Sequence, residues 1–400
     1  MSLKMIMIVQ VEKLAASQMR NRIRDKINSW LIVFLIASKL LTQIIVSFVD
    51  LYIVLISVTF IFFILVIYLI NNKFSVNVNF IFFIVFLFVF FVANLLFVKE
   101  YTMVASIEFS KLLIYGCSAF LISMVKFDLE YFKRYWYVTS IFFMVILHIF
   151  ILLNLIKNIN YMSIGFVLSF ANVGFAFRYY NTRKTRWLLL MLYTLFLVIV
   201  FAHRGAIIVN LTLIIYLFLS TRKIKRDEMI MCLVVMLVAL TTLFVSGLLT
   251  KLLVNSLSNI TKISSRSIYH ILADIQKGKI NLTGREEFFK AGWDMLKEHH
   301  YIIPSGFGKF QYLTGMGSAH SILLDLPLMF GALSIFVPVF LIKSIREIRL
   351  YACSDFKHIY ACLFIYTIME SIINTAFFVD FPFWILIGLS FTRHYYFRDH

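Results

Sequence analysis

The sequence predicts an all-α membrane protein that crosses the bilayer many times. Hydrophobic residues make up 62% of the 400 positions, only 14% are charged, and the mean hydropathy is +0.90. These values are typical of integral membrane proteins and lie outside the range of soluble domains. The apolar residues form long runs of about 20, the length that a helix needs to cross a hydrocarbon core of about 30 Å. They do not resemble the short alternating strands of a membrane barrel.

About twelve transmembrane helices are expected from these runs. They lie near residues 30–48, 51–70, 79–98, 103–125, 136–156, 161–179, 186–203, 205–220, 229–250, 320–342, 358–378 and 380–395. The chain thus divides into an N-terminal segment (1–29), helices 1–9 (30–250), a polar loop domain (251–319), helices 10–12 (320–395) and a tail (396–400). Basic residues and apolar residues at helical spacing in the N-terminal segment predict an amphipathic helix on the inner leaflet.

Lysine and arginine are distributed unevenly between alternate connections. With a cytoplasmic N-terminus, only Lys99, Lys157 and Arg204 fall in the short outer loops. The positive-inside rule therefore predicts that both termini are cytoplasmic and that residues 251–319 form a large extracytoplasmic loop between helices 9 and 10. The net charge of +18 is then mostly a topogenic signal, and we expect no nucleic-acid partner.

Ionisable residues inside spans are costly and are candidates for function. They are Lys39 near the middle of the membrane, and Glu108, Lys111, His148, Asp325 and Glu370 in the outer halves of their spans. Glu108 and Lys111, three residues apart, are expected to neutralise each other, and His148 is expected to be a hydrogen-bonded packing residue. Glu370 and Asp325 are candidates for lining either a substrate cavity or a proton path.

Arg204 is a candidate phosphate-binding residue. It lies in His203-Arg204-Gly205, where one apolar run ends at the outer lipid boundary and the next begins at once. A guanidinium there can donate two parallel hydrogen bonds to phosphate oxygens. The alternative is an arginine that only reaches the lipid phosphates.

A helix is expected to begin near Thr283 in the outer loop. Thr283 and Glu286 fit a capping box, and Phe289, Trp293 and Leu296 recur at spacings of four and three. This spacing predicts an amphipathic helix that rests on the membrane face.

Arg285 stands in the first turn of this expected helix. A cation there opposes the helix dipole, so its placement calls for a nearby anion such as phosphate, which the free amides of the turn would help to bind. A solvated arginine paired with Glu286 or Glu287 is the alternative.

Two further features lie between the expected helix and the tenth span. Gly306 and Gly308 form a turn that permits close backbone approach, and with Trp293, Asp325 and Glu370 they are candidates for the wall of a substrate cavity. His320 lies at the outer mouth of the tenth span. With an ordinary pKa of about 6.5 it can take a proton from a hydroxyl, although a structural role is the alternative.

No metal or cofactor site is expected. The four cysteines, Cys117, Cys232, Cys353 and Cys362, fit no metal set. The glycine turns match neither a P-loop nor a dinucleotide fingerprint, and no Asp-x-Asp motif lies in an outer segment.

The order and spacing of these motifs resemble the O-antigen ligase and polymerase superfamily, and most closely the Wzy-type polymerases of O-antigen or capsular polysaccharide. The motifs are Arg204, Gly284-Arg285 with Trp293, Gly306-Phe307-Gly308, Ala319-His320-Ser321 and Phe330-Gly331-Ala332. The hydropathy likeness covers nearly the whole chain, and the motif likeness covers residues 200–335. A His-Asn pair is common in that family, whereas this chain has His320-Ser321, so the role of the asparagine cannot be carried over.

The resemblance implies a GT-C-like, metal-independent glycosyltransferase without cofactor in the bacterial inner membrane. Such an enzyme transfers a growing undecaprenyl-diphosphate-linked glycan onto a lipid-linked repeat unit at the outer face, in O-antigen (lipopolysaccharide) or capsule biosynthesis. Arg204 and Arg285 would stabilise the leaving diphosphate, and His320 would act as the base. The implied partners are the undecaprenyl-diphosphate-linked oligosaccharide, membrane lipid and a protein that regulates chain length.

Three other functions stay open. An O-antigen ligase, which transfers the glycan to lipid A core, would share almost every feature, but the doubled histidine motif of such ligases is not evident. A lipid-linked oligosaccharide flippase also has about twelve helices, but it does not need a basic outer loop of this length. A solute transporter is disfavoured because paired broken helices are not evident among only 14 glycines and 4 prolines.

Overall fold

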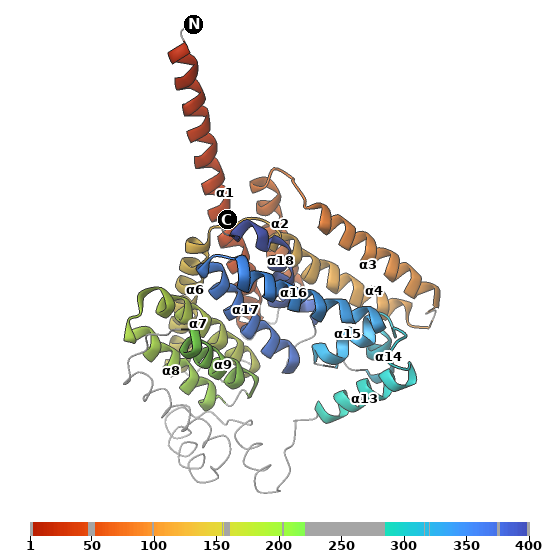
Figure 1. Cartoon of the computed structure of the whole chain (residues 1–400). Helices are drawn as coiled ribbons and strands as arrows, with labels where there is room; N and C mark the ends of the chain where they lie inside the picture. Colours follow the sequence, from red (N-terminus) through yellow and green to blue (C-terminus); the bar gives the residue numbers. More distant parts are fainter. Residues whose placement is uncertain are drawn as a thin grey trace.

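A computed structural model shows a bundle of helices joined by connections (Figure 1). It describes residues 3–46, 53–97, 100–153, 155, 161–201, 204–220, 285–315, 317–319, 321–373 and 377–397. The first half contains α1 (Leu3–Val46), α2 (Ile53–Asn71), α3 (Val78–Phe97), α4 (Thr102–Lys111), the π-helix η1 (Leu112–Cys117), α5 (Ser118–Ser123), α6 (Leu129–Leu152), α7 (Tyr161–Thr182), α8 (Thr185–Val200) and α9 (Arg204–Ser220). The second half contains α13 (Arg285–Glu298), α14 (Lys309–Thr314), α15 (Ile322–Phe330), η3 (Gly331–Ile335), α16 (Phe336–Tyr351), α17 (Ser354–Ile373), η4 (Phe377–Val379), α18 (Phe381–Thr392) and η5 (Arg393–Tyr396).

Five helical segments in the described part of the chain are long and apolar enough to cross a membrane. They are Val54–Asn71, Val78–Leu96, Thr102–Ser123, Leu129–Leu152 and Ile322–Tyr351. A helix satisfies its own backbone hydrogen bonds, which the bilayer core requires, so these segments indicate a helical membrane protein. The predicted run 229–250 lies outside the described residues, as does most of the predicted outer loop, and each of the other predicted runs overlaps a described helix.

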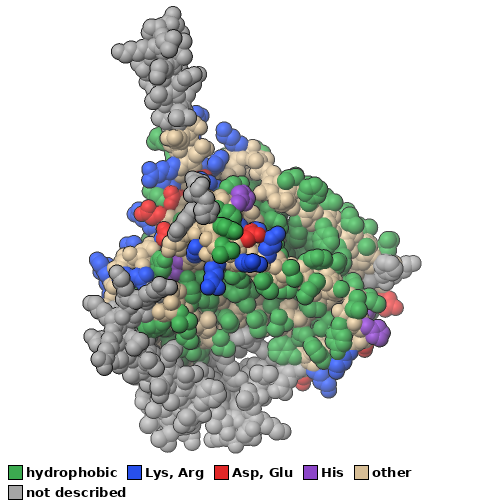
Figure 2. All heavy atoms as spheres, viewed as in Figure 1, with side chains coloured by type: hydrophobic (Ala, Val, Ile, Leu, Met, Phe, Trp, Pro, Cys, Tyr) green, Lys and Arg blue, Asp and Glu red, His purple; other side chains and the backbone are tan. Residues whose placement is uncertain are grey.

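Large hydrophobic side chains cover the outward faces of α2 and α3. Phe62, Phe63, Phe82 and Phe88 are among the exposed ones. Figure 2 shows hydrophobic side chains across much of the visible surface, with Lys and Arg gathered around α1 and again near α13. An apolar surface of this extent suits contact with lipid better than contact with water.

Helix α1 is one uninterrupted helix of 44 residues. Its first part projects from the bundle and its second part enters it (Figure 1), and Met19 and Ile23 on the projecting part are exposed. The sequence predicts a boundary at residue 29, between an amphipathic helix on the inner leaflet and the first span. The helix continues through that boundary because neither glycine nor proline interrupts it.

Segments that were predicted to share the inner side meet at one end of the bundle. Asn28 Nδ2 donates to the carbonyl oxygen of Lys126 at 2.9 Å, and Asn71 Nδ2 donates to Asn28 Oδ1 at 2.9 Å. The amide of Phe127 donates to Tyr396 Oη at 2.9 Å. These bonds join α1, the end of α2, the α5–α6 connection and η5.

Two more connections belong to the same end. Lys133 Nζ lies 3.0 Å from Asp355 Oδ2 and donates to Asn181 Oδ1 at 3.1 Å. The hydroxyls of Tyr180 and Ser354 are 2.8 Å apart. Helix α6 is thereby fixed to the end of α7 and the start of α17, which is the pairing that the predicted alternation of spans requires.

The opposite end gathers segments that were predicted to be outer. Tyr101 Oη donates to the carbonyl oxygen of Ser305 at 3.3 Å, and the amide of Ser305 donates to the carbonyl oxygen of Leu328 at 2.8 Å. A small separate core holds α13, α14 and α15 together; its members are Met295, Leu296, Phe310, Ala319, Leu324 and Leu328. This unit therefore packs against the start of α4.

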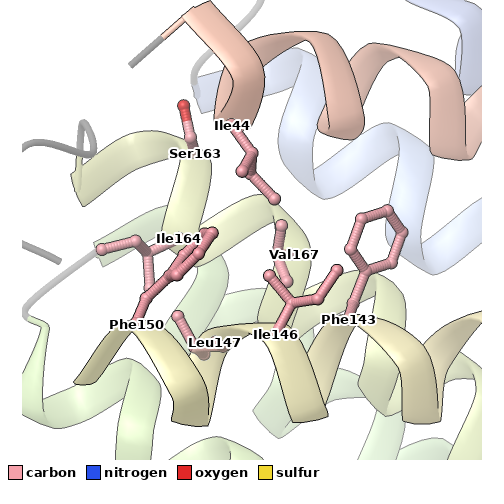
Figure 3. Close-up of a pocket in the computed structure, with 8 residues that line it drawn as sticks. All are labelled: Ile44, Phe143, Ile146, Leu147, Phe150, Ser163, Ile164 and Val167. Atoms are coloured by element: carbon pink, nitrogen blue, oxygen red, sulfur yellow. The ribbon is translucent and has the colours of Figure 1, made fainter. Parts of the chain in front are cut away.

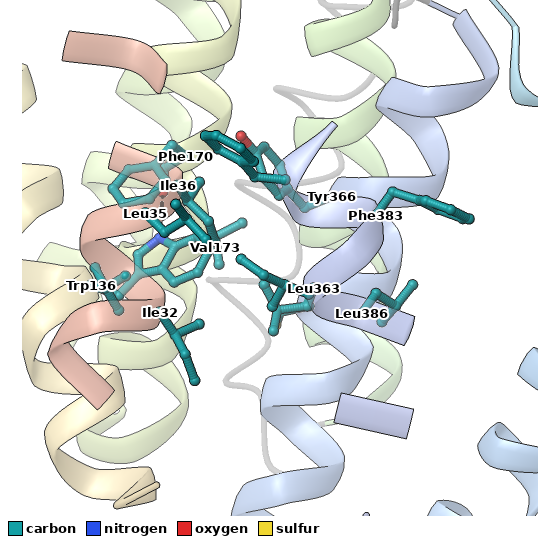
Figure 4. Packing of buried hydrophobic residues seen from close by; sticks show 14 of the residues in the cluster. Ile32, Leu35, Ile36, Trp136, Phe170, Val173, Leu363, Tyr366, Phe383 and Leu386 are labelled. Atoms are coloured by element: carbon teal, nitrogen blue, oxygen red, sulfur yellow. Dashed lines mark hydrogen bonds between the residues drawn. The ribbon is translucent and has the colours of Figure 1, made fainter. Parts of the chain in front are cut away.

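The main core surrounds the second part of α1. Figure 4 shows Leu35 and Ile36 of α1 near Trp136 of α6 and Phe170 of α7, with Tyr366 of α17 nearby. Trp136 is fully buried; its ring stacks on Phe170, and Nε1 donates to the carbonyl oxygen of the same residue at 2.9 Å. The polar atom of the largest core side chain is thus satisfied, as a buried position requires.

Candidate functional site

A cavity of about 210 Å³ opens beside α1. Its volume is smaller than the roughly 300–1,000 Å³ that is usual for ligand pockets. Its lining comes from five elements or connections and consists of Ser38, Lys39, Thr42, Ser57, Tyr115, Val379 and Phe381. Tyr115 belongs to the π-helix η1 and is hydrogen-bonded to Ser57. Single π turns inside α-helices are frequent at functional sites, and here the π-helix carries a tyrosine that lines the cavity.

A second cavity, of about 10 Å³, lies between α1, α6 and α7 (Figure 3). All of its lining side chains except Ser163 are hydrophobic. This volume is about that of one water-sized probe, so the larger cavity is the better candidate for a site.

The larger cavity adjoins a group of polar residues that we call the Lys39 cluster: Lys39, Tyr366, Glu370, Ser371 and Asp380. Lys39 Nζ lies 3.6 Å from Asp380 Oδ1, and Ser371 Oγ donates to Asp380 Oδ2 at 2.7 Å. Glu370 is hydrogen-bonded to Tyr366 and interacts with the charge of Asp380. Glu370 and Asp380 are 3% and 1% exposed, whereas the side chain of Lys39 is 25% exposed. The ammonium group is therefore the part of the cluster that reaches the cavity.

A second buried group, the Glu108 cluster, consists of Glu108, Lys111 and Asp325. Lys111 Nζ donates to Glu108 Oε1 at 2.7 Å, which confirms the predicted neutralisation within one helix. Asp325 Oδ1 accepts a hydrogen bond of 2.9 Å from the amide of Ala319. Within the described residues, Glu108 Oε2 and Asp325 Oδ2 are buried without a hydrogen-bond partner, and the two carboxyl groups are close enough for their charges to interact.

The connection η4 lies between the two clusters. It packs against α4, η1 and α15, the elements that carry or adjoin the Glu108 cluster. Asp380 of the Lys39 cluster follows η4 directly. Asp325 and Glu370, which the sequence suggested for one cavity, thus belong to neighbouring but distinct clusters.

The turn at Gly306 and Gly308 packs closely against α3 and α4. Gly306 and Gly308 have φ angles of +81° and +79°. A Cβ on Gly308 would lie 2.6 Å from the backbone nitrogen of Ala105, and one on Gly306 would overlap the Asn94 side chain. Phe307 between them is fully buried. The close approach predicted at these glycines is therefore made to α3 and α4.

Trp293 lies away from both cavities. It is 49% exposed, and its ring edge meets Tyr301 at a centroid distance of 5.8 Å. Phe289 and Leu296 pack in the small core between α13 and α15. Trp293 thus remains largely exposed, whereas Phe289 and Leu296 on the same helix contact this core.

The predicted diphosphate-binding and base residues are described only in part. Helix α9 begins at Arg204 and α13 begins at Arg285, as the sequence suggested. The side chains of both arginines, the whole of His320 and the capping residue Thr283 lie outside the described residues. Their convergence on one pocket stays a prediction.

His148 is a packing residue, as expected. Its Nδ1 donates to the carbonyl oxygen of Met144 and its Nε2 accepts from the hydroxyl of Tyr193, both at 2.6 Å. Both ring nitrogens are thereby occupied within the bundle.

The Lys39 cluster was not predicted from the sequence. Lys39 could be recognised as a candidate, because it is an ionisable residue inside a predicted span. Asp380 lies at the start of another predicted span. Their pairing is a tertiary contact between the two ends of the chain, which no local pattern reveals.

Comparison of the chain with models of protein families, with curated proteins and with solved structures gave no match.

Proposed function

We propose that this chain is a metal-independent membrane glycosyltransferase of the polysaccharide polymerase type. It would transfer a growing undecaprenyl-diphosphate-linked glycan onto a lipid-linked repeat unit at the outer face of the bacterial inner membrane. In this proposal the fold is GT-C-like, with twelve spans, of which one lies in residues 229–250, and with both termini cytoplasmic.

One observation carries the proposal: α13, which begins at Arg285, is docked against the segment that precedes His320. Gly292 of α13 faces Ala319 so closely that a Cβ on the glycine would lie 3.4 Å from that of Ala319. Met295 and Leu296 share a buried core with Ala319. The helix that starts with the candidate diphosphate-binding arginine and the segment that leads to the candidate base thus form one packed unit.

The proposed reaction needs only groups of these kinds. A hydroxyl oxygen of the lipid-linked repeat unit forms a bond to the anomeric carbon of the growing glycan, and the bond from that carbon to the diphosphate oxygen breaks. His320 would accept the hydroxyl proton. Arg204 and Arg285 would stabilise the negative charge on the departing diphosphate through paired hydrogen bonds.

The test replaces Arg285 by alanine in cells that depend on this chain for surface glycan. We expect single-repeat glycan at the surface and no ladder of longer products. Lys297→Ala on the same helix is the matched control, because its side chain is 55% exposed, and it should leave the ladder intact. A normal ladder in Arg285→Ala cells would reject the proposal. Polymer that accumulates on the carrier, with none on the lipid core, would indicate a ligase.

A lipid-linked oligosaccharide flippase or transporter is the second candidate. The Lys39–Asp380 pair beside a cavity favours it, because ionisable groups inside the membrane often mark substrate or ion pathways. In that case Lys39→Met should remove all repeat units from the outer face, rather than only the long chains.

A further inference from the structure

We propose that α6, α7 and α8 form a binding site for the phosphate group of an anionic phospholipid, at the end of the bundle that was predicted to be inner. The site consists of Tyr137 of α6, Arg178 of α7, and Arg186 and Trp187 of α8. Helix α7 packs against both α6 and α8 (Figure 1), so the three helices bring these residues together. This inference does not depend on the proposed function, because it uses none of the residues assigned to glycosyl transfer.

Two guanidinium groups share one indole ring at this site. The guanidinium carbon of Arg186 lies 4.6 Å from the centre of the Trp187 ring, and that of Arg178 lies 6.0 Å from the same centre. Arg178 also lies 5.0 Å from the centre of the Tyr137 ring, which meets Trp187 edge-on at a centroid distance of 5.1 Å. Cation–π attraction favours both cations at this place. The two like charges repel each other, and a bound anion offsets that repulsion.

The described part of the chain places no carboxylate on these cations. Arg178 and Arg186 are exposed, and neither forms an ion pair with an acidic side chain that the structure describes. The first turn of α8 contains no acidic residue, and its N-cap residue Lys184 makes no side-chain capping hydrogen bond. The positive end of the helix dipole therefore adds to the charge of the two arginines, which favours an anionic ligand.

Trp187 supplies a hydrogen-bond donor that lacks an acceptor. The residue is 7% exposed, and its Nε1 is buried without a hydrogen-bond partner among the described residues. A buried indole N–H usually has a partner. Since the two exposed arginines lie against this ring, a small movement of their side chains opens the indole to an incoming oxygen. The group that is missing is thus an acceptor, in agreement with an anion.

The surrounding surface favours a lipid over a free phosphate compound. Exposed apolar side chains continue from the site along both helices, with Val138, Ile141 and Phe142 on α6 and Leu189 and Phe196 on α8. Acyl chains can lie on this surface while the arginines bind the phosphate. Tryptophan and tyrosine are also typical of the headgroup level of a membrane. A water-soluble phosphate compound would gain nothing from the apolar surface.

Native mass spectrometry of the full-length protein, released from detergent micelles, tests the proposal. The wild-type protein should retain phosphatidylglycerol more strongly than phosphatidylcholine. Arg178→Gln combined with Arg186→Gln should weaken the binding of phosphatidylglycerol by about tenfold or more, because charge-assisted hydrogen bonds to phosphate are lost. Arg346→Gln combined with Arg349→Gln is the matched control. Both of these arginines are exposed near the end of α16, so the control removes the same charge and should leave the binding unchanged.

Fluorescence quenching by brominated phosphatidylglycerol gives an independent readout. Part of the quenched tryptophan signal should be absent in Trp187→Phe, which keeps an aromatic ring but has no N–H. The same part should be absent in the double variant at Arg178 and Arg186. Identical quenching in all three proteins would contradict a lipid bound at Trp187.

Glycerol 3-phosphate, which carries the phosphate group without acyl chains, separates the two sources of the ligand. It should not displace phosphatidylglycerol when both are present at the same concentration. Displacement under these conditions would assign the site to a soluble phosphate compound and overturn the lipid proposal. Equal retention of phosphatidylglycerol and phosphatidylcholine by the wild-type protein, or unchanged retention by the double variant at Arg178 and Arg186, would overturn the site itself.

Discussion

The Asp325 side chain is hydrogen-bonded to the backbone of Ala319, six residues earlier in the chain. The amide of Ala319 donates to Asp325 Oδ1 at 2.9 Å. Both residues are buried. The bond holds the segment around His320 against the first turn of α15, although His320 itself lies outside the described residues.

Asp325→Ala should therefore destabilise the protein. The loss of the Asp325 carboxylate leaves the buried amide of Ala319 without an acceptor, which costs about 1–3 kcal/mol of unfolding free energy. Asp325→Asn keeps an oxygen acceptor at the same position and should cost less. Thermal unfolding in detergent measures both, and equal losses would show that the hydrogen bond does not hold this segment.

Gly308→Ala should be more destabilising than Gly315→Ala. Both glycines have positive φ angles, +79° and +66°, so each substitution carries a backbone cost of about 1–2 kcal/mol. At Gly315 the new methyl group has open space, whereas at Gly308 it meets the backbone of Ala105, and this adds about 1–3 kcal/mol. The difference in unfolding temperature between the two variants isolates the contact with α4, and the absence of a difference would contradict it.

Acid should weaken the unit formed by α13 and α14 through His299. Burial, with Lys309 beside it, lowers the pKa of His299, and Lys309 Nζ donates to its Nε2 at 2.5 Å. The folded state thus favours neutral His299, while the unfolded chain takes up a proton near the ordinary pKa of about 6.5. The stabilisation is complete above that pH and is lost as the pH falls below it.

His299→Gln should reduce this loss when unfolding temperatures are compared between about pH 7 and pH 5. Lys309→Met removes one of the causes that lower the pKa of His299 and should give a smaller pH dependence than wild type. An unchanged dependence in both variants would show that other groups control acid stability.

Arg204→Lys and Arg285→Lys should both impair polymerisation if the proposed function holds. A lysine keeps the charge but cannot make two parallel hydrogen bonds to phosphate, so we expect a loss of about tenfold or more, and of about 100-fold or more for the alanine variants. Polymer formation from purified undecaprenyl-diphosphate-linked repeat units measures this, with Lys297→Ala as control. Full activity in both lysine variants would argue against diphosphate binding at these positions.

Local patterns predicted much of the helical framework. Apolar runs located α2 and α3 to within two residues at each end, because a lipid-facing helix must be apolar along its whole length. The Glu108–Lys111 pair was also predicted correctly, since its partners lie three residues apart in one helix. The hydrogen-bonded role of His148 was predicted as well, although its partner Tyr193 was not.

Contacts between distant segments were beyond prediction. Lys39 and Asp380 come together only because α1 and the start of α18 pack in the same bundle. The exposed position of Trp293 depends on which face of α13 meets α15, and helical spacing alone does not specify it. The α-helical pattern around Tyr115 likewise gave no sign of the π-helix.

The unbroken helix α1 links the N-terminus mechanically to the cavity. At 1.5 Å per residue its 44 residues form a rod about 66 Å long, with Lys39 on the part inside the bundle. A force applied to the projecting end is transmitted along this helix, because no break or kink interrupts it. A fusion partner or surface tether attached there would strain the lysine's surroundings, so immobilisation through the other terminus is the gentler choice.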